Sequence, residues 1–365
     1  MSVRVLFIAG SFPPHPCGVG DYTARLAGAL ARLDGVRVAV LTQEGARMKP
    51  QANVEILGVA RGWRIGEISA LLRSVRLWAP DLVHIHYPSQ GFYGRVLPTL
   101  FPVACRALGL AVVLTWHEPW PIRAALRFLF QRAGAHGLIF VRPNYAKSLP
   151  LLLRPLITKL LQDTVVSAGS LPVSTQTSSG REVLRRHYLQ GVKNLVVFFG
   201  FLYPSKGVES IFEIADPATD AIVIIGASKD AVYLSKLKHA AELHGWKEHV
   251  HYLGFVPETE AADLLSAADA VVLPFVNGSG QWNTSVHGAL AQGTLVITTA
   301  INPTGDDPVR NMYTASISGI EEMRFALRTL VGRRVAASSN LDAWERIARN
   351  HHEFYVRVRQ STYKN

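Results

Sequence analysis

Short, continuous runs of apolar residues alternate with amphipathic stretches along the first half of this 365-residue chain. Turn residues bound these runs, which we interpret as strands at Val3–Ala9, Val36–Leu41, Asn53–Val59, Leu82–His86, Ala111–Trp116 and Gly137–Val141. Between them, apolar residues recur at helical spacing, at Tyr22–Leu33, Ile68–Trp78 and Ile122–Ala133. Strands that are apolar throughout are typical of a parallel sheet covered by helices on both faces. The pattern therefore predicts a doubly wound α/β domain.

The same alternation starts again after a stretch rich in Ser, Thr and Gly at residues 168–181. The strands expected in this second series are Asn194–Phe199, Ala221–Ile225, Val250–Leu253, Ala270–Leu273 and Thr294–Thr298. We interpret 168–181 as an inter-domain linker and expect two Rossmann-like domains, at residues 1–172 and 173–344. The C-terminal ends of both sheets should face a cleft between them, since that edge is where such sheets bind ligands. A last helix, from about Leu341 to Arg359, ends the chain without a following strand.

Apolar residues make up 48% of the chain, which excludes an intrinsically disordered protein. The two cysteines, Cys17 and Cys105, are too few for a disulfide framework or a four-cysteine zinc site, so we expect a reducing compartment. The first apolar run is too short for a signal-peptide core or a membrane span. We therefore expect a cytoplasmic protein, either free or attached to the inner face of the cell membrane.

The net charge of +11 lies entirely in the first half of the chain. Residues 1–170 hold 19 basic and 8 acidic side chains, whereas the remaining residues hold 19 of each. Such segregation favours an anionic partner: a membrane surface, a phosphorylated acceptor or a nucleic acid. No nucleic-acid motif and no pattern of stacking aromatic residues is present, so we expect no nucleic-acid partner.

Seven basic residues, and no acidic ones, lie between Glu118 and Asp163. They are interleaved with apolar runs and comprise Arg123, Arg127, Arg132, Arg142, Lys147, Arg154 and Lys159. A basic helix with an apolar face can lie on an anionic membrane. The alternative is an ordinary helix that packs its leucines on the sheet and exposes its arginines to solvent. The concentration of all the net charge in this half favours a membrane or a lipid-diphosphate acceptor.

Two glycines, Gly18 and Gly20, stand in the expected loop between the first strand and the first helix. Glycine lets a backbone approach a ligand closely, and a helix N-terminus favours anions. A tight strand-to-helix turn without a ligand would explain the same residues.

His117 directly follows the expected strand Ala111–Trp116, where a side chain reaches the ligand-binding edge of the sheet. A packed core histidine is the alternative. His84 and His86 end the preceding strand and would offer two further metal ligands beside His117. Because no clear fourth ligand accompanies them, we expect no metal site.

In the second half, Lys206 follows the strand Asn194–Phe199 and is expected to open the next helix. A cation at that place can neutralise a departing diphosphate. Thr284 and Ser285 follow the strand Ala270–Leu273 and are typical N-cap residues, whose hydroxyls can also hold phosphate oxygens. Capping alone would explain them, but their pairing with Lys206 at one edge of a sheet favours a phosphate site.

Several segments resemble, in this order, the family 4 glycosyltransferases, which have the GT-B fold of two Rossmann-like domains. These segments are Pro16–Tyr22, Asp81–Pro88, Leu114–Glu118, Phe199–Gly207, Leu253–Pro257, Ala267–Phe275 and Gly288–Val296. The resemblance covers nearly the whole chain. The segment from Trp344 to Tyr355 is similar to the family's last helix, which crosses back to the first domain, so residues from about 345 to 365 would join that domain.

This resemblance implies a retaining, metal-independent transfer of a sugar from a nucleotide-sugar donor, with no cofactor. Fixed positive charge and N–H dipoles would stabilise the nucleoside diphosphate as it leaves. No carboxylate nucleophile stands in the motifs, so double displacement is not supported. The residues that the resemblance assigns are His117 and Lys206 to catalysis, Gly18, Gly20, Lys206, Thr284 and Ser285 to the diphosphate, and Phe255 and Val256 to the base.

The chain departs from the family pattern at two positions near the phosphate loop. Many members carry two glutamates eight positions apart, where this chain has Gly280 and Gly288. The first glutamate contacts the sugar and the second holds the ribose, so Asn283 or His287 would have to replace part of that binding. The arginine that often follows the glycine of the lysine motif is replaced by Phe201.

The sequence therefore predicts a hexosyltransferase that acts on a saccharide or lipid-linked acceptor in polysaccharide or glycoconjugate assembly. Two alternatives remain open. A catalytically silent partner that only binds nucleotide-sugars would explain the missing glutamates. A sugar-nucleotide epimerase shares the two-domain architecture but would need carboxylates in its cleft, and the motifs contain none.

Overall fold

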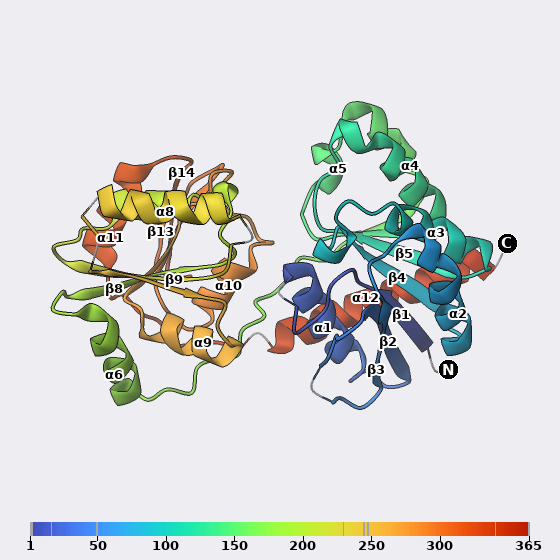
Figure 1. Cartoon of the computed structure of the whole chain (residues 1–365), viewed down its shortest axis with the longest axis horizontal. Helices are drawn as coiled ribbons and strands as arrows, with labels where there is room; N and C mark the ends of the chain where they lie inside the picture. Colours follow the sequence, from blue (N-terminus) through green and yellow to red (C-terminus); the bar gives the residue numbers. More distant parts are fainter. Residues whose placement is uncertain are drawn as a thin grey trace. The chain divides into compact units, whose positions relative to one another are not determined.

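Two sheets dominated by parallel strands, each with helices on both faces, make up the chain (Figure 1). The computed structural model describes residues 3–15, 17–48, 50–228, 230–243, 245–246, 248–339 and 341–363. The chain divides into unit 1, Met1–Ser167 with Leu341–Asn365, and unit 2, Ala168–Asn340. The boundaries between the units, after Ser167 and before Leu341, lie a few residues before the domain boundaries predicted after residues 172 and 344.

Unit 1 contains a seven-stranded, all-parallel sheet in the order β3-β2-β1-β4-β5-β6-β7. Its strands are β1 (Val3–Ile8), β2 (Val36–Gln43), β3 (Val54–Ala60), β4 (Leu82–Tyr87), β5 (Ala111–Trp116), β6 (Gly137–Phe140) and β7 (Leu161–Thr164). Its α-helices are α1 (Gly18–Leu30), α2 (Ile68–Trp78), α3 (Leu97–Ala107), α4 (Ala125–Gly134), α5 (Tyr145–Ser148) and α12 (Leu341–Tyr363). Short 3₁₀ turns are η1 (Ile65–Glu67), η2 (Gln90–Phe92), η3 (Ile122–Ala124) and η4 (Leu151–Leu156).

Unit 2 repeats this arrangement in the order β10-β9-β8-β11-β12-β14-β13, with only β13 antiparallel to its neighbour. Its strands are β8 (Asn194–Phe199), β9 (Asp220–Ile225), β10 (Val250–Gly254), β11 (Ala270–Leu273), β12 (Val296–Ala300), β13 (Gly305–Asp307) and β14 (Met312–Ser316). Its helices are α6 (Ser178–Leu189), α7 (Ile211–Ile214), α8 (Ala231–Leu243), α9 (Glu258–Ala267), α10 (Thr284–Leu290) and α11 (Ile320–Leu330), with 3₁₀ turns η5 (Pro204–Lys206) and η6 (Val208–Ser210). The two sheets confirm the predicted α/β class.

Helix α12 belongs to unit 1, where it packs along α1 and against β5 (Figure 1, red beside blue). A glycine in β6 permits this close approach, because a Cβ on Gly137 would lie only 2.7 Å from Val358 and 2.8 Å from the Phe354 ring. The helix buries one apolar face, which includes Trp344, Ile347, Ala348, Phe354, Tyr355 and Val358. This burial fixes the end of the chain to the first sheet.

The expected linker at 168–181 is partly helical. Helix α6 begins at Ser178 because Thr177 caps it, its hydroxyl accepting a hydrogen bond of 3.1 Å from the Gly180 amide. The sequence patterns also miss the edge strand β7 and the strands β13 and β14. β7 reads Leu-Gln-Asp-Thr and β13 reads Gly-Asp-Asp, and neither is apolar enough to stand out as a strand.

Candidate active site

In unit 2, the loops that follow β8 and β11 lie backbone to backbone at the C-terminal edge of the sheet. Since β8 and β11 are parallel neighbours, both loops start at the same edge. The backbone of Gly207, with φ of 60°, passes so close to the Pro274 carbonyl that a Cβ there would overlap it. The amide of Val276 donates to the Ser205 carbonyl at 3.2 Å. The loop that carries Lys206 is therefore held against the loop that leads to Ser285.

Lys206 ends the 3₁₀ turn η5 and does not open a helix, which corrects the expectation from sequence. Its Nζ lies 4.6 Å from the ring centroid of Phe275, the second residue after β11. This cation–π contact places the ammonium group at the ligand-binding edge of the sheet.

Thr284 and Ser285 are the first two residues of α10, and its N-cap is Asn283, so the prediction that they cap the helix is wrong. Ser285 faces the end of β8, because a Cβ on Gly200 would lie 3.0 Å from its hydroxyl oxygen. Gly200 tolerates this approach with φ of 145°. The Ser285 hydroxyl and the Lys206 loop thus meet at the end of one strand.

Asn283 and His287 brace the loop from which they project. The Asn283 Oδ1 accepts a hydrogen bond of 2.7 Å from the Gly280 amide, and the Asn283 amide donates to the Gly280 carbonyl at 3.0 Å. His287 Nε2 lies 2.6 Å from the Gln281 carbonyl and donates to it. These bonds give both residues a structural role, and their binding of a sugar or ribose stays a prediction.

Phe255 and Val256 follow β10, which is two strands away from β8 in the sheet. The Phe255 ring is 59% exposed, whereas Val256 packs partly against the core of unit 2. Their role at a nucleotide base stays a prediction.

In unit 1, Gly18 and Gly20 lie in the first turn of α1, not in a loop before it. Gly20 is buried, and a Cβ there would lie 2.7 Å from the Ser11 carbonyl. Gly18 is exposed. Close packing against the Ser11 backbone therefore accounts for Gly20, while Gly18 remains accessible at the helix end.

His117 is partly exposed and joins a cluster of rings at the ends of β4 and β5. Its Nε2 lies 3.1 Å from Nδ1 of His86, and the Tyr22 ring packs edge-on against it at 5.1 Å. Burial, with a smaller contribution from the nearby His351, lowers the pKa of His117 to about 3. His117 is therefore neutral near pH 7.

His84, His86 and His351 complete this cluster and are fully buried. His84 bonds the Tyr355 hydroxyl at 2.6 Å and the Thr115 hydroxyl at 2.7 Å. In the described part of the chain, no three His, Cys, Asp or Glu side chains are arranged to hold a metal ion.

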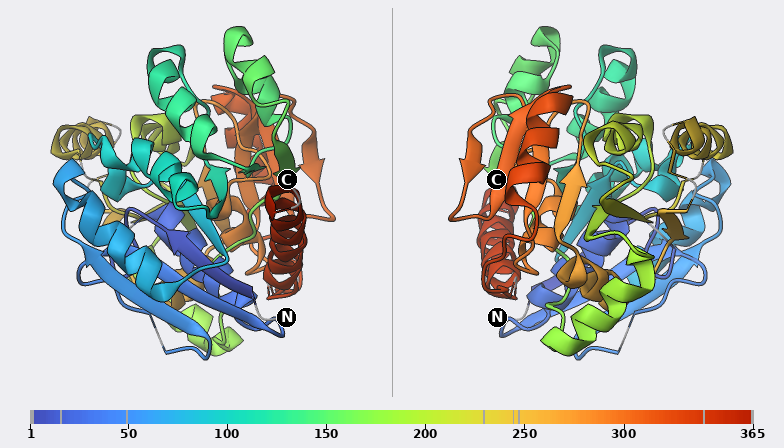
Figure 2. Two further views of the ribbon diagram at one scale, coloured as in Figure 1. Left: turned by 90° about the vertical axis from the view of Figure 1, so that its right-hand side faces the viewer. Right: turned by 90° about the vertical axis from the view of Figure 1, so that its left-hand side faces the viewer.

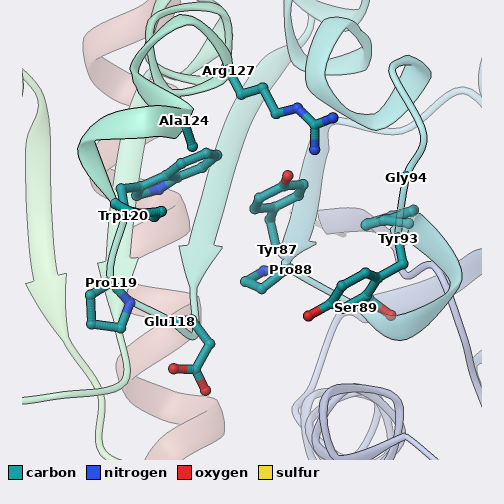
Figure 3. Close-up of a pocket in the computed structure, with 12 residues that line it drawn as sticks. Tyr87, Pro88, Ser89, Tyr93, Gly94, Glu118, Pro119, Trp120, Ala124 and Arg127 are labelled. Carbon is teal, nitrogen blue, oxygen red and sulfur yellow. The ribbon is translucent and has the colours of Figure 1, made fainter.

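A pocket of about 190 Å³, which no sequence motif indicated, lies beside the ends of β4 and β5. Aromatic rings dominate its wall, and Tyr87 and Trp120 stack within 5° of parallel. Figure 3 shows the Arg127 guanidinium pointing toward the Tyr87 hydroxyl, with Glu118 and Tyr93 also at the pocket. The segments 87–94 and 118–127 meet only in the folded unit, so the periodicity of the sequence could not predict this pocket.

Two family models match the chain, "Glycosyltransferase Family 4" over residues 16–153 and "Glycosyl transferases group 1" over residues 193–331. The chain belongs to glycosyltransferase family 4. This confirms the family and the transferase class that the motifs indicated.

Relatives of this family 4 glycosyltransferase include two curated enzymes. A 2-deoxystreptamine N-acetyl-D-glucosaminyltransferase from Streptomyces fradiae is 23% identical over 66% of this chain and 60% of its own length. A GDP-mannose-dependent alpha-mannosyltransferase from Mycobacterium tuberculosis is 25% identical over 67% of this chain and 68% of its own length. The match thus spans less than two thirds of the first of these relatives.

Solved structures share the fold over almost their whole length. Sucrose-phosphate synthase from Thermosynechococcus elongatus superposes with a TM-score of 0.71 at 16% identity, covering 98% of this chain and 99% of the other. HepE from Anabaena, solved with UDP and glucose, gives 0.67 at 14% identity and covers 98% of both chains.

The two positions where the family pattern has glutamates are filled differently in this glycosyltransferase. The Trp282 ring lies where a side chain at position 280 would project, so even a Cβ on Gly280 would overlap it. A Cβ on Gly288 would lie 3.2 Å from the Leu171 side chain. An indole and an aliphatic chain thus occupy the space beside these positions, and Trp282 is a site residue that the sequence motifs did not single out.

Proposed function

We propose that this chain moves a hexose from a nucleoside-diphosphate sugar to a saccharide or lipid-linked acceptor in polysaccharide or glycoconjugate assembly. The donor diphosphate would bind unit 2, at the ends of β8 and β11. The two curated relatives transfer sugars, and HepE was solved with UDP and glucose, which supports a nucleotide-sugar donor.

The observation that carries this proposal is the ammonium group of Lys206 over the Phe275 ring, beside the loop leading to Ser285. When the bond between the anomeric carbon and the diphosphate oxygen breaks, its electron pair goes to the diphosphate. A fixed cation and the hydroxyls of Thr284 and Ser285 would stabilise that charge as it develops. The acceptor oxygen forms the new bond to the anomeric carbon, and its proton goes to the departing diphosphate.

We propose that the transfer retains the anomeric configuration and needs no metal ion, with Lys206 supplying the positive charge. His117 would hydrogen-bond the transferred sugar, and its neutral state suits a hydroxyl partner. The accessible end of α1 at Gly18 would contribute to the phosphates. Product configuration by NMR, and turnover in EDTA, test the first two points.

The acceptor saccharide would bind the aromatic pocket of unit 1. Rings such as Trp120 and Tyr93 offer apolar faces to a sugar ring, and Arg127 and Glu118 offer polar contacts at the rim. An acceptor with an anionic group would suit Arg127 best.

A membrane would hold this acceptor close to the pocket. In unit 1, Leu126, Leu151 and Leu152 are 69%, 73% and 80% exposed, so these leucines do not pack on the sheet. Figures 1 and 2 show α4 and the segment from α5 to η4 at the same end of unit 1. The basic side chains Arg127 and Lys147 are exposed in these segments, as are Arg123 just before α4 and Lys159 just after η4. We name this set of exposed leucines and basic residues the basic apolar surface, and propose that it binds anionic lipid. No helix within the described ranges is long and apolar enough to cross a membrane.

The first experiment measures thermal stabilisation by a panel of nucleoside diphosphates and nucleotide-sugars, since a ligand of the folded state raises the melting temperature. We expect a shift with one base in the wild type and none in Lys206→Ala. A shift that Lys206→Ala retains would show that the diphosphate binds elsewhere.

A second candidate, a silent nucleotide-sugar-binding partner, is favoured by one observation: Trp282 fills the space beside position 280. Donor binding without transfer or hydrolysis, in the presence of lipid-linked and soluble acceptors, would favour this candidate over the transferase.

A further inference from the structure

His86 and His117 form a hydrogen bond between two imidazole rings at the ends of β4 and β5. Nδ1 of His86 lies 3.1 Å from Nε2 of His117. Burial lowers the pKa of both rings, so both are neutral and each carries one proton. One nitrogen of the pair must therefore donate and the other accept.

Either His86 or His117 can be the donor, and the surroundings of Nε2, the second ring nitrogen of His86, decide between these two arrangements. His86 is 0% exposed, and its Nε2 has no hydrogen-bond partner among the described residues. It is surrounded by rings, with Phe7 at 5.2 Å, Tyr22 at 5.6 Å and His84 at 4.4 Å between centroids. If His117 donated, the proton of His86 would have to sit on Nε2, as a buried N–H group without a partner. If His86 donates from Nδ1, Nε2 carries only a lone pair, and an unpaired acceptor is tolerated better than an unpaired N–H.

We propose that His86 is a positioning residue, whose Nδ1–H donates to Nε2 of His117 and so keeps the proton of His117 on Nδ1. His117 then presents an N–H donor at Nδ1, the ring nitrogen that does not contact His86. The inference rests on the proposed function, in which that donor meets an oxygen of the transferred sugar. It also specifies that His117 does not act as a base through Nε2.

His84 offers a matched control on the same strand. It is as buried as His86, but both of its nitrogens face hydroxyls, of Tyr355 and Thr115. Hydroxyls can donate or accept, so either tautomer of His84 is satisfied. A substitution at His84 therefore removes a buried imidazole without removing the donor to His117.

The direct test is an NMR spectrum of the ¹⁵N-histidine-labelled full chain that correlates ring nitrogens with ring protons and separates protonated from unprotonated nitrogens. The His117 signals are assigned by their loss in His117→Gln. We expect His117 protonated at Nδ1 in the wild type and in His84→Asn. A wild-type His117 protonated at Nε2 would overturn the proposal.

Two near-isosteric variants separate positioning from packing. His86→Asn places an amide N–H near the position of Nδ1, whereas His86→Leu places a methyl group there. We expect His86→Leu to lower kcat about tenfold or more with little change in donor KM, and His86→Asn to restore most of that loss. The donor-induced thermal shift verifies that both variants are folded.

Equal kcat in the Asn and Leu variants, with both folded, would show that His86 only fills space and would overturn the proposal. Should His86→Leu fail to fold, the wild-type spectrum and the His86→Asn spectrum still decide the tautomer. If His117→Gln turns over like the wild type while the spectrum shows Nδ1–H, the hydrogen bond is upheld and the catalytic role in the proposed function is wrong.

Discussion

The two units share a strand order around their central strands. However, different kinds of residue form the C-terminal edges of their sheets. In unit 1, bulky rings fill the edge: His86, His117, Tyr22 and Tyr87 contact one another or their neighbours. In unit 2, glycines in the loops let other groups approach closely, the Ser285 hydroxyl at Gly200 and the Pro274 carbonyl at Gly207. The difference teaches that one fold can end its strands in packed rings in one copy and, in the other, in the closely packed loops to which we assign the donor diphosphate.

The net charge differs even more between the two units than between the two halves of the sequence. With α12 included, unit 1 holds 24 basic and 11 acidic residues, whereas unit 2 holds 14 and 16. Because a donor diphosphate would bind the unit without excess positive charge, its recognition must rest on individually placed groups such as Lys206. The excess charge of unit 1 is consistent with the anionic lipid surface that we propose as its partner.

The largest effect should come from removing that individually placed charge. We expect Lys206→Ala to lower kcat/KM roughly 10²–10³-fold, the loss typical of a single group that stabilises transition-state charge. Lys206→Arg, which keeps the charge, should lose less. Initial rates with the donor identified by thermal shift measure both; wild-type rates in the alanine variant would mean that unit 2 does not bind the leaving group through this residue.

Lower pH should destabilise unit 1 more than unit 2. His84, His86, His117 and His351 all have pKa values lowered by burial, to about 3 for His117 and about 4 for His351. Below about pH 6.5 the unfolded chain binds protons that the folded unit does not, so stability is complete above 6.5 and is lost as the pH falls toward 4 and 3.

Between pH 7 and pH 5 we expect unit 1 to lose at least about 2 kcal/mol, the amount for one fully buried histidine. Unit 2 should lose less, since its His251 is partly exposed. Hydrogen exchange resolved by peptide follows the two units separately. Equal loss of protection in both would contradict the buried, neutral state of the cluster.

A pair of substitutions in the first turn of α1 separates packing from ligand binding. Gly20→Ala should destabilise unit 1 by about 1–3 kcal/mol, because its Cβ would meet the Ser11 carbonyl at 2.7 Å. Gly18→Ala, at an exposed position, should leave stability nearly unchanged. Denaturant unfolding measures both, and a donor-binding defect in Gly18→Ala alone would support its role at the phosphates.

The smallest effect concerns the basic apolar surface. Binding to vesicles of anionic lipid should weaken by about 1 kcal/mol for each exposed basic residue removed, as in Lys147→Gln or Lys159→Gln, and should fall with salt. Lys236→Gln in α8 of unit 2 is the control and should bind as the wild type does. Equal binding of all variants in a sedimentation assay would show that the surface does not carry membrane attachment.

The order of strands and helices could be predicted wherever a strand is buried on both faces. β1, β5, β8 and β11 are mostly apolar runs, and the pattern fixes them to within a few residues. The edge strands β7 and β13 could not be predicted, because they are half polar and their pairing partners supply the stabilisation.

The features of the candidate site also fall into those that could be predicted from the sequence and those that could not. Strand-end positions such as His117 and Lys206 could be predicted, since a parallel sheet brings the residues after its strands to one edge. The cap of α10, the packing of Gly20 on Ser11 and the ring of Trp282 over Gly280 could not, because each depends on where a neighbouring loop folds.

By itself, the sequence determined the two doubly wound sheets, the glycosyltransferase family and the residues at the strand ends, since apolar periodicity and ordered motifs are local properties of the chain. Only the tertiary structure decided the aromatic pocket, the packing of α12 on α1 and β5, and the pairing of His86 with His117. These features join residues that are far apart in sequence, and they exist only because burial and hydrogen bonding in the folded units bring those residues together.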